Sequence, residues 1–234
     1  MRARRTVIVY FDGFALYKAL LQQRYPQYKW LDLAALAKRL FPHREVVGVK
    51  YFTAPLKPLT NDPGIGQRQQ VYWRALRTTE VEIIEGIFTF TKQYLPESPE
   101  RLDQSGRVVT VRVKRPEEKG TDVALASHLL VDAFEQRADS FAIVTNDSDL
   151  VPPLRMLSER GYSVALVSVV GPRYNKAFEG IGLNRSPADP SRHPCRLSTP
   201  PARRRLGRPA DQKTAPVELT TNEAGPRRSG GRAR

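Results

Sequence analysis

The sequence predicts a three-layer α/β/α fold with a mainly parallel central sheet, and two observations lead to that prediction. Short runs rich in β-branched residues alternate with helical patterns over residues 1–184, which is typical of a parallel sheet covered by helices. The longest apolar runs, such as residues 141–144 and 164–170, stop at strand length, far short of the roughly 20 residues that span a bilayer. We therefore expect a doubly wound domain with no membrane segment.

The first half of this domain is expected to hold three strands and three helices. Residues 7–11 form an apolar run that Asp12 closes, as in a buried strand. Leu33, Leu36 and Leu40 recur at helical spacing and share one face. In chain order the expected elements are a strand (7–12), two helices (16–23 and 31–40), a strand (46–53), a helix (67–77) and a strand (81–89).

The second half continues the alternation. Residues 108–113 alternate like an antiparallel partner of the preceding strand or a neighbouring ribbon, and the polar segment 92–104 between them is expected to be a mobile excursion. The last helix is closed by Gly161 in the C′ position. The remaining expected elements are a helix (121–135), a strand (141–145), a helix (150–160) and a strand (163–169).

The charge is unevenly distributed along the chain. Residues 185–234 carry 12 Lys or Arg and 4 Asp or Glu, so they hold +8 of the net charge of +14 and leave +6 for residues 1–184. This stretch is rich in Pro, Gly, Ser and Arg and lacks apolar periodicity, so we expect a folded domain (1–184) followed by a disordered basic tail (185–234). The Arg203, Arg204, Arg205 cluster is either a solvated charge run or an arm for phosphate backbones.

Several classes of protein are excluded by the same composition. The single cysteine, Cys195, rules out a disulfide scaffold and favours a reducing, cytoplasmic setting. The basic residues 1–5 and the apolar run after them resemble the start of a secretory signal peptide, but Asp12 ends the apolar run before it reaches the length that such a signal needs. No P-loop and no GxGxxG motif occurs, so a nucleotide cofactor is not expected. The net charge favours an anionic partner, and nucleic acid is the commonest one.

Four acidic residues follow the predicted strands or open the predicted helices. Asp12 closes the first strand, Asp122 stands in the first turn of helix 121–135, and Asp147 and Asp149 follow strand 141–145. Each alone is explained as a helix cap. Together they come from three segments to one edge of the sheet, where mutual repulsion would raise their pKa values unless a divalent cation neutralised them. Such oxygen ligands suit Mg²⁺ or Mn²⁺.

Three short motifs, in order and spacing, resemble a known family. They are DGFxLY at residues 12–17, KGxDVxLAxHLL at 119–130 and NDSDL at 146–150. The segment from about residue 5 to 170 looks like an NYN domain of the LabA-like group, within the PIN-like nuclease superfamily. The resemblance implies a Rossmann-like PIN fold, dependence on a divalent metal and cleavage of RNA. Carried over by position, the metal-binding and catalytic acids are Asp12, Asp122, Asp147 and Asp149.

The leading hypothesis is therefore a metal-dependent endoribonuclease. A metal-activated water would attack the scissile phosphate in line and leave a 5′-phosphate and a 3′-hydroxyl. Lys119 would lie beside the pocket, and Arg68, Arg74 and Arg77 on the outward face of helix 67–77 would hold flanking phosphates, unless they are ordinary helix surface. The aromatic residues Phe14, Tyr17, Tyr72 and Trp73 are candidates to stack on an unpaired base or to pack in the core.

Three further residues are expected to support the acids from nearby: Asn146, Ser148 and His128. The family usually has Asn where this chain has Ala15, which supports an alternative, a catalytically weak nucleic-acid-binding or regulatory protein with the same fold. A third alternative is a phosphohydrolase that acts on a small phosphate ester. It is weaker, because Phe14 stands where a phosphoaspartyl enzyme of the DxD type has its second acid. RNA is the expected partner with DNA as the other choice, and a homodimer is a further expectation.

Overall fold

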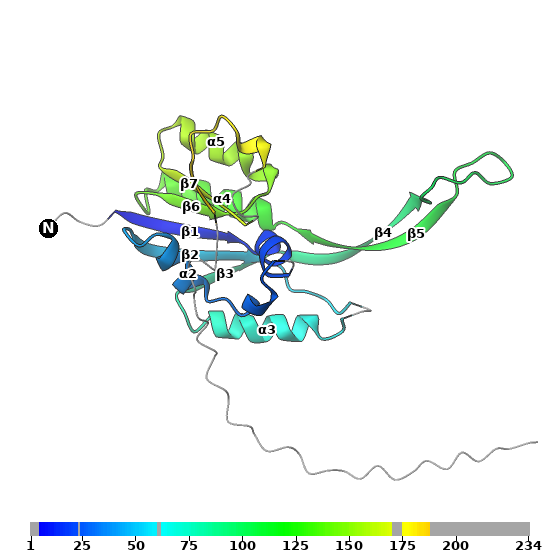
Figure 1. Ribbon diagram of the computed structural model, residues 1–234, viewed down its shortest axis with the longest axis horizontal. Helices are drawn as coiled ribbons and strands as arrows, with labels where there is room; N and C mark the ends of the chain where they lie inside the picture. Colours follow the sequence, from blue (N-terminus) through cyan, green and yellow to red (C-terminus); the bar gives the residue numbers. More distant parts are fainter. Residues whose placement is uncertain (1–4, 23, 60–61, 170–174, 188–234) are drawn as a thin grey trace, which may run out of the picture. The chain divides into compact units, whose positions relative to one another are not determined.

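The computed structural model describes residues 5–22, 24–59, 62–169 and 175–187. Its six-stranded sheet is parallel throughout, in the order β3-β2-β1-β6-β7-β8 (Figure 1). The predicted parallel sheet is therefore confirmed. The strands are β1 (Thr6–Asp12), β2 (Glu45–Thr53), β3 (Val81–Glu85), β6 (Phe141–Val144), β7 (Val164–Ser168) and β8 (Asn184–Pro187).

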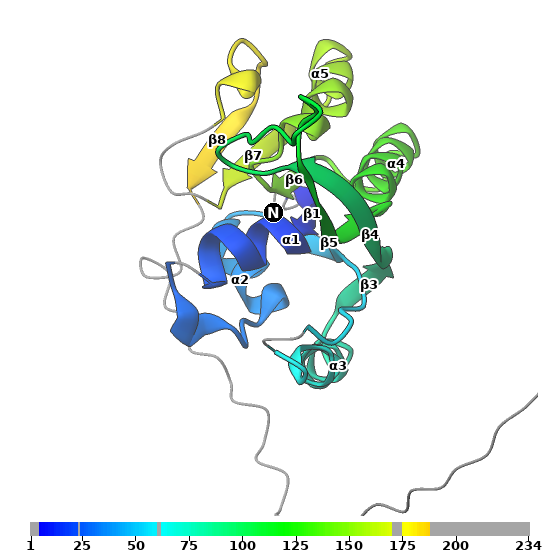
Figure 2. The same ribbon diagram turned by 90° about the vertical axis from the view of Figure 1, so that its right-hand side faces the viewer.

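Helices cover both faces of the sheet, which makes three layers (Figure 2). One apolar core lies between the sheet and the helices α2 and α3 together with the turns that follow β1; the other lies beneath α4 and α5. Alternate residues of β1 serve the two cores, Val9 facing the first and Tyr10 the second. The helices are α1 (Gly13–Ala15), α2 (Leu33–Leu40), α3 (Ile65–Leu76), α4 (Thr121–Phe134) and α5 (Val151–Glu159).

Local sequence signals account for several helix ends. Asp32 caps α2 by accepting a hydrogen bond from the Ala35 amide. Gly161 has a φ of +79° just beyond α5, which confirms the predicted C′ glycine. The predicted helix at residues 16–23 is a π-helix over Leu16–Gln22, and two short 3-10 turns, Pro26–Tyr28 and Ser148–Leu150, were not expected.

The inward face of α3 differs from the prediction. The helical spacing of residues 67–77 predicts that Val71, Ala75 and Leu76 point inward, but Val71 is 41% exposed, and Trp73 fills the core with 1% exposure. The larger indole buries more apolar surface than the valine, so the helix turns toward it. Trp73 is therefore not available for stacking on a base.

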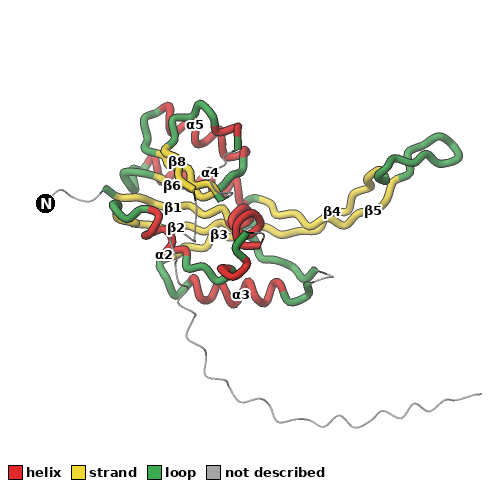
Figure 3. The backbone as a smooth tube through the Cα atoms, viewed as in Figure 1, coloured by secondary structure: helices red, strands yellow, loops and turns green. Residues whose placement is uncertain are grey.

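The strand predicted over residues 81–89 breaks at Gly86. After this glycine the chain enters β4 (Ile87–Pro96), which pairs antiparallel with β5 (Thr110–Lys119) in a ribbon outside the main sheet (Figures 1 and 3). The expected mobile excursion is therefore wrong for residues 92–96, because they pair along β4. A Cβ at Gly86 would lie 2.6 Å from Thr121 Cγ2 and 2.9 Å from the Lys119 carbonyl oxygen, so the root of the ribbon sits tightly against the start of α4.

At the other edge of the sheet, β8 extends the parallel order by one strand. The sequence analysis placed most of these residues in the basic tail, and the rest of that tail, residues 188–234, lies outside the described residues. Within the ranges that the structure describes, no helix is both long and apolar enough to cross a membrane.

Candidate functional site

The candidate site lies at the carboxyl ends of β1 and β6. These strands are neighbours at the point where the strand order reverses, with β2 and β3 on one side and β7 and β8 on the other. Ligands of doubly wound sheets bind in the crevice at such a switch point. Asp12 is the last residue of β1, and Asp147 follows β6 after a two-residue gap.

Asp12 is held in a fixed position. Its Oδ1 accepts a 2.9 Å hydrogen bond from the Ala15 amide, and its Oδ2 accepts one of 2.6 Å from the Thr145 hydroxyl. Burial raises the pKa of Asp12, and these two hydrogen bonds oppose the rise. The backbone at Ala15 thus orients the acid without any contribution from the side chain at that position.

Asp122 is influenced electrostatically by Asp12, Asp147 and Asp149. The pKa of Asp122 is raised to about 6. Burial is the largest cause, and the negative charges of Asp12, Asp147 and Asp149 add to it. Asp147 caps the 3-10 turn after β6 by accepting a 3.0 Å hydrogen bond from the Asp149 amide. The charges of the three other predicted acids thus all act on Asp122.

A fifth acid, Glu118, joins this group, and the sequence analysis missed it. Burial raises the pKa of Glu118 to about 7, with the charges of Asp12 and Asp122 adding to the effect. Its Oε1 is buried and has no hydrogen-bond partner within the described ranges. Glu118 was missed because the predicted strand stopped at residue 113, whereas β5 continues to Lys119 and brings the glutamate back to the sheet.

The donors in this group are all carboxylates, which suits a hard divalent cation such as Mg²⁺ or Mn²⁺. The unpartnered Glu118 oxygen and the raised pKa values of Asp122 and Glu118 both mark an excess of negative charge that a cation would relieve. Among the described side chains, no three of His, Cys, Asp or Glu converge as a ready-made metal site. Mg²⁺ keeps several waters and needs only one or two carboxylates, so the acids fit it as a partly hydrated ion.

The three predicted supporting residues fall in different places. Asn146 Oδ1 accepts a 3.0 Å hydrogen bond from the Asn175 amide and so ties the loop after β6 to a later segment. Ser148 is exposed in the 3-10 turn between Asp147 and Asp149. His128 points elsewhere, with Nδ1 3.4 Å from Lys50 Nζ and its ring against Phe52.

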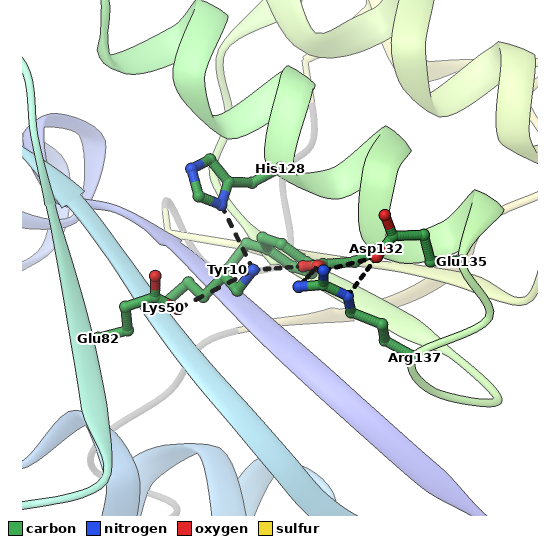
Figure 4. A network of polar contacts seen from close by, with 7 residues as sticks. All are labelled: Tyr10, Lys50, Glu82, His128, Asp132, Glu135 and Arg137. Atoms are coloured by element: carbon green, nitrogen blue, oxygen red, sulfur yellow. Dashed lines mark hydrogen bonds and ion pairs between the residues drawn. The ribbon is translucent and has the colours of Figure 1, made fainter.

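Figure 4 shows that His128 belongs to a polar network that joins α4 to the sheet. Its centre is the buried Asp132, whose Oδ2 accepts hydrogen bonds from Lys50 Nζ (2.6 Å) and the Tyr10 hydroxyl (2.7 Å). Arg137 lies 3.0 Å from the other Asp132 oxygen. This network stabilises the packing of α4, and these contacts involve none of the four predicted acids.

The predicted phosphate-binding cations are mostly exposed and partly paired. Lys119 Nζ lies 3.5 Å from Glu117, and Arg77 lies 3.0 Å from Glu85. Arg68 is paired with Asp62, and Arg74 is exposed on α3. Of these residues, Arg68 lines the cavity described below.

Comparison with known proteins identifies the domain. The family model of the NYN domain matches residues 7–179, about three-quarters of the chain. The chain belongs to the NYN domain family. Its parallel α/β/α architecture agrees with a PIN-like NYN fold, as the motifs implied.

Individual relatives are more distant. A Pseudomonas putida protein named 6-hydroxy-3-succinoylpyridine 3-monooxygenase HspA is 30% identical over 188 residues, which cover 70% of this chain and 58% of that protein. The NYN chain thus spans less than two-thirds of this curated relative. A crystal structure of a Vibrio parahaemolyticus protein of unknown function covers 81% of the chain and 96% of its own length, at 18% identity and a TM-score of 0.49.

An aromatic cavity of about 150 Å³ adjoins the acids of the NYN domain. Gly13, next to Asp12, and Glu118 both line it. A Cβ at residue 13 would lie 2.5 Å from the Phe52 carbonyl oxygen, so only glycine allows this close approach of the chain to β2. The aromatic residues of the lining are Phe14, Tyr17, Trp30, Tyr51 and Tyr72.

One face of the β4–β5 ribbon is basic and aromatic. Side chains alternate between the faces of a strand, so Phe90, Lys92 and Tyr94 share a face with Arg112 and Lys114, which pair with Tyr94 and Lys92 across the ribbon. Lys114 Nζ lies 4.2 Å from the centre of the Phe90 ring. In the described part of the chain none of the three cations forms an ion pair with an acid. We call this surface the basic ribbon face.

Proposed function

We propose that this NYN domain is a metal-dependent endoribonuclease. One observation carries the proposal: acids from β1, the start of α4 and the loop after β6 interact with one another at the switch point of the sheet. Like charges that act on one another are unfavourable without a cation, and acids with raised pKa values often mark catalytic sites. Membership in the NYN family agrees with this reading.

In the proposed mechanism, Asp12, Asp122, Asp147 and Asp149 hold a Mg²⁺ or Mn²⁺ ion. A divalent ion held by these acids would supply a water of lowered pKa and a positive charge beside the scissile phosphate for in-line attack. The Thr145 hydroxyl and the Ala15 amide keep Asp12 oriented, and the hydrogen bonds also favour its ionised form. Cleavage would leave a 5′-phosphate and a 3′-hydroxyl.

The basic ribbon face supports a polyanionic substrate. Lys92 and Lys114 are cross-strand neighbours, and like charges placed opposite each other destabilise a ribbon unless a partner neutralises them. The exposed Tyr94 beside Arg112 adds a surface on which a base can stack. A single strand of RNA has both the charge and the unpaired bases that this face accepts.

The assay is cleavage of an end-labelled single-stranded RNA by the purified full-length chain. We expect cleavage with Mn²⁺ or Mg²⁺, no cleavage with excess EDTA, and loss of cleavage in Asp147→Asn. Glu159→Gln, an exposed acid on α5, is the matched control and should cleave like the unchanged protein. Metal-independent cleavage, or full activity of Asp147→Asn, would refute the proposed mechanism.

The catalytically weak alternative depends on Ala15. The Ala15 amide already holds Asp12 at 2.9 Å, which favours an active site over an inactive one. Salt-sensitive RNA binding without cleavage at any metal concentration would support the weak alternative, and recovery of cleavage in Ala15→Asn would locate the defect. Assignment to the LabA-like group, a cytoplasmic location and a homodimer belong to the same proposal.

A second candidate function comes from the relative named a 6-hydroxy-3-succinoylpyridine 3-monooxygenase. The aromatic cavity favours it, because the volume of about 150 Å³ is near that of cavities that bind benzene. Hydroxylation of a pyridine ring would consume dioxygen and two electrons from a reduced cofactor and release water. The test is substrate-dependent oxygen consumption with a nicotinamide donor and flavin supplied, and absence of this uptake would dismiss the candidate.

A further inference from the structure

We propose that the aromatic cavity beside Asp12 binds one pyrimidine base of a single-stranded RNA. The proposal rests on the proposed nuclease function, because it names the part of the substrate that the site selects. It is carried by the size of the cavity, by its aromatic walls and by the charged groups that line it.

The size of the cavity matches one six-membered ring. An apolar protein cavity of 150 Å³ binds benzene, and the cavity here has about the same volume. A purine has two fused rings and would leave one of them outside. A cavity of this volume therefore favours a pyrimidine over a purine.

The walls supply flat faces for stacking. Trp30 and Tyr72 lie with ring centres 6.0 Å apart and Tyr51 and Tyr72 with ring centres 6.3 Å apart, both pairs edge to face. Phe14 and Trp30 remain 54% and 39% exposed, although large apolar side chains are stabilised by burial. A base stacked at this opening would cover them.

Charged groups of both signs line the cavity. Lys29 and Arg68 are exposed residues that line it and can hold a phosphate. Glu118 lines it as well, and carboxylate oxygens accept hydrogen bonds from base amino groups such as N4 of cytosine. Because Gly13 also lines the cavity, the phosphate attached to a bound nucleoside would lie close to Asp12.

The chemistry that the cavity recognises is a six-membered nitrogen heteroaromatic ring joined to an anionic group. A pyrimidine nucleotide within RNA provides it, and so does a free pyridine carboxylate. The basic ribbon face favours RNA, because a small molecule would not reach it. The experiment below separates the two sources.

The test measures binding of fluorescent 12-residue oligonucleotides to the full-length chain in EDTA, where no cleavage occurs. We expect oligouridylate and oligocytidylate to bind more tightly than oligoadenylate. Trp30→Ala should weaken pyrimidine binding by about 5- to 150-fold, the range for loss of one stacked base, and should leave oligoadenylate binding unchanged. Trp30→Phe keeps a stacking face and should retain most of the affinity. Phe134→Ala removes another exposed aromatic ring, 51% against 39% for Trp30, at the end of α4 and is the matched control.

The outcomes separate this proposal from the nuclease proposal. Equal losses for uridylate and adenylate in Trp30→Ala, or no loss for either, would overturn the base pocket even if the chain cleaves RNA. Pyrimidine-selective binding that depends on Trp30 would support the pocket even if no cleavage is found. Displacement of a bound oligouridylate by pyridine-3-carboxylate at lower concentrations than by uridine monophosphate would assign the cavity to a small molecule and overturn the RNA proposal.

Discussion

Replacing Asp122 by Asn should stabilise the metal-free protein. The carboxyl group of Asp122 has a pKa of about 6 in the folded chain against an ordinary value of 3.8, because burial and the charges of Asp12, Asp147 and Asp149 disfavour its ionised form. The ionised carboxylate of Asp122 therefore destabilises the folded state. The neutral amide keeps the shape of the side chain and removes the charge.

The size of the gain follows from the pKa difference. A rise from 3.8 to about 6 is worth about 3 kcal/mol at 1.36 kcal/mol for each pKa unit. Asp122 is only half-buried, and water screens its interactions, so we reduce the expected gain to about 1 kcal/mol. For a domain of this length the midpoint of thermal unfolding would rise by roughly 2–4 °C.

The sign of the pH dependence can be worked out from the same values. A group whose folded pKa lies above its unfolded pKa contributes most stability below the unfolded value and loses it as the pH rises through the folded value. The advantage of Asp122→Asn should therefore be full at pH 8, shrink between pH 6 and pH 4, and vanish below about pH 4.

The assay is urea denaturation in EDTA at pH 8 and pH 4.5, repeated at pH 8 with Mn²⁺. Added Mn²⁺ should stabilise the unchanged protein more than the variant, because the variant has lost a proposed ligand. Asp139→Asn is the control of opposite sign, since hydrogen bonds from Thr6 lower the pKa of Asp139. The reasoning would be refuted if Asp122→Asn lowered the free energy of unfolding at pH 8, or if its gain were the same at both pH values.

Three other substitutions test other parts of the structure. Thr145→Val removes the hydroxyl that donates to Asp12, so the pKa of Asp12 should rise and the acidic limb of the pH–activity profile should move to higher pH. Urea denaturation should show that the free energy of unfolding falls by about 1.5–3 kcal/mol. Asp132→Asn leaves the buried Lys50 with Glu82, at 3.9 Å, as its one acidic partner among the described residues and should cost about 3 kcal/mol by urea denaturation, while Glu82→Gln should cost under about 1 kcal/mol. Gly86→Ala places a methyl group against the Lys119 carbonyl and should lower the free energy of unfolding by about 1–3 kcal/mol. Gly48→Ala, where the added Cβ would lie 3.3 Å from its nearest neighbour, should lower it less. Equal losses for the two variants by calorimetry would contradict the close packing at Gly86.

The parts of the fold that follow strong local patterns could be predicted from the sequence. The parallel strands and the helix that carries Leu125 and Leu129 were predicted because an apolar period identifies a buried face. The ribbon was only partly predicted, since β4 and β5 pair outside the main sheet and need no apolar period. β8 was missed because its residues have the composition of the tail.

The candidate site was predicted where acids follow strands directly. Asp12 and Asp147 stand beside strand ends, and strand ends of a parallel sheet meet at one edge. Glu118 could not be found in this way, because its position depends on how far a ribbon strand runs. Nor could the role of His128 be read from its spacing alone: only the tertiary packing places it beside Lys50.

The basic ribbon face has a consequence for the length of the substrate. Arg112 and Glu118 lie on the same face of β5, six residues apart, which at about 3.4 Å per residue places them roughly 20 Å from each other. At about 3.4 Å per stacked nucleotide, that span corresponds to roughly six nucleotides. An RNA shorter than this could occupy the acids or the outer end of the ribbon, but not both, so under the proposed function the ribbon would disfavour short fragments, including the products of cleavage.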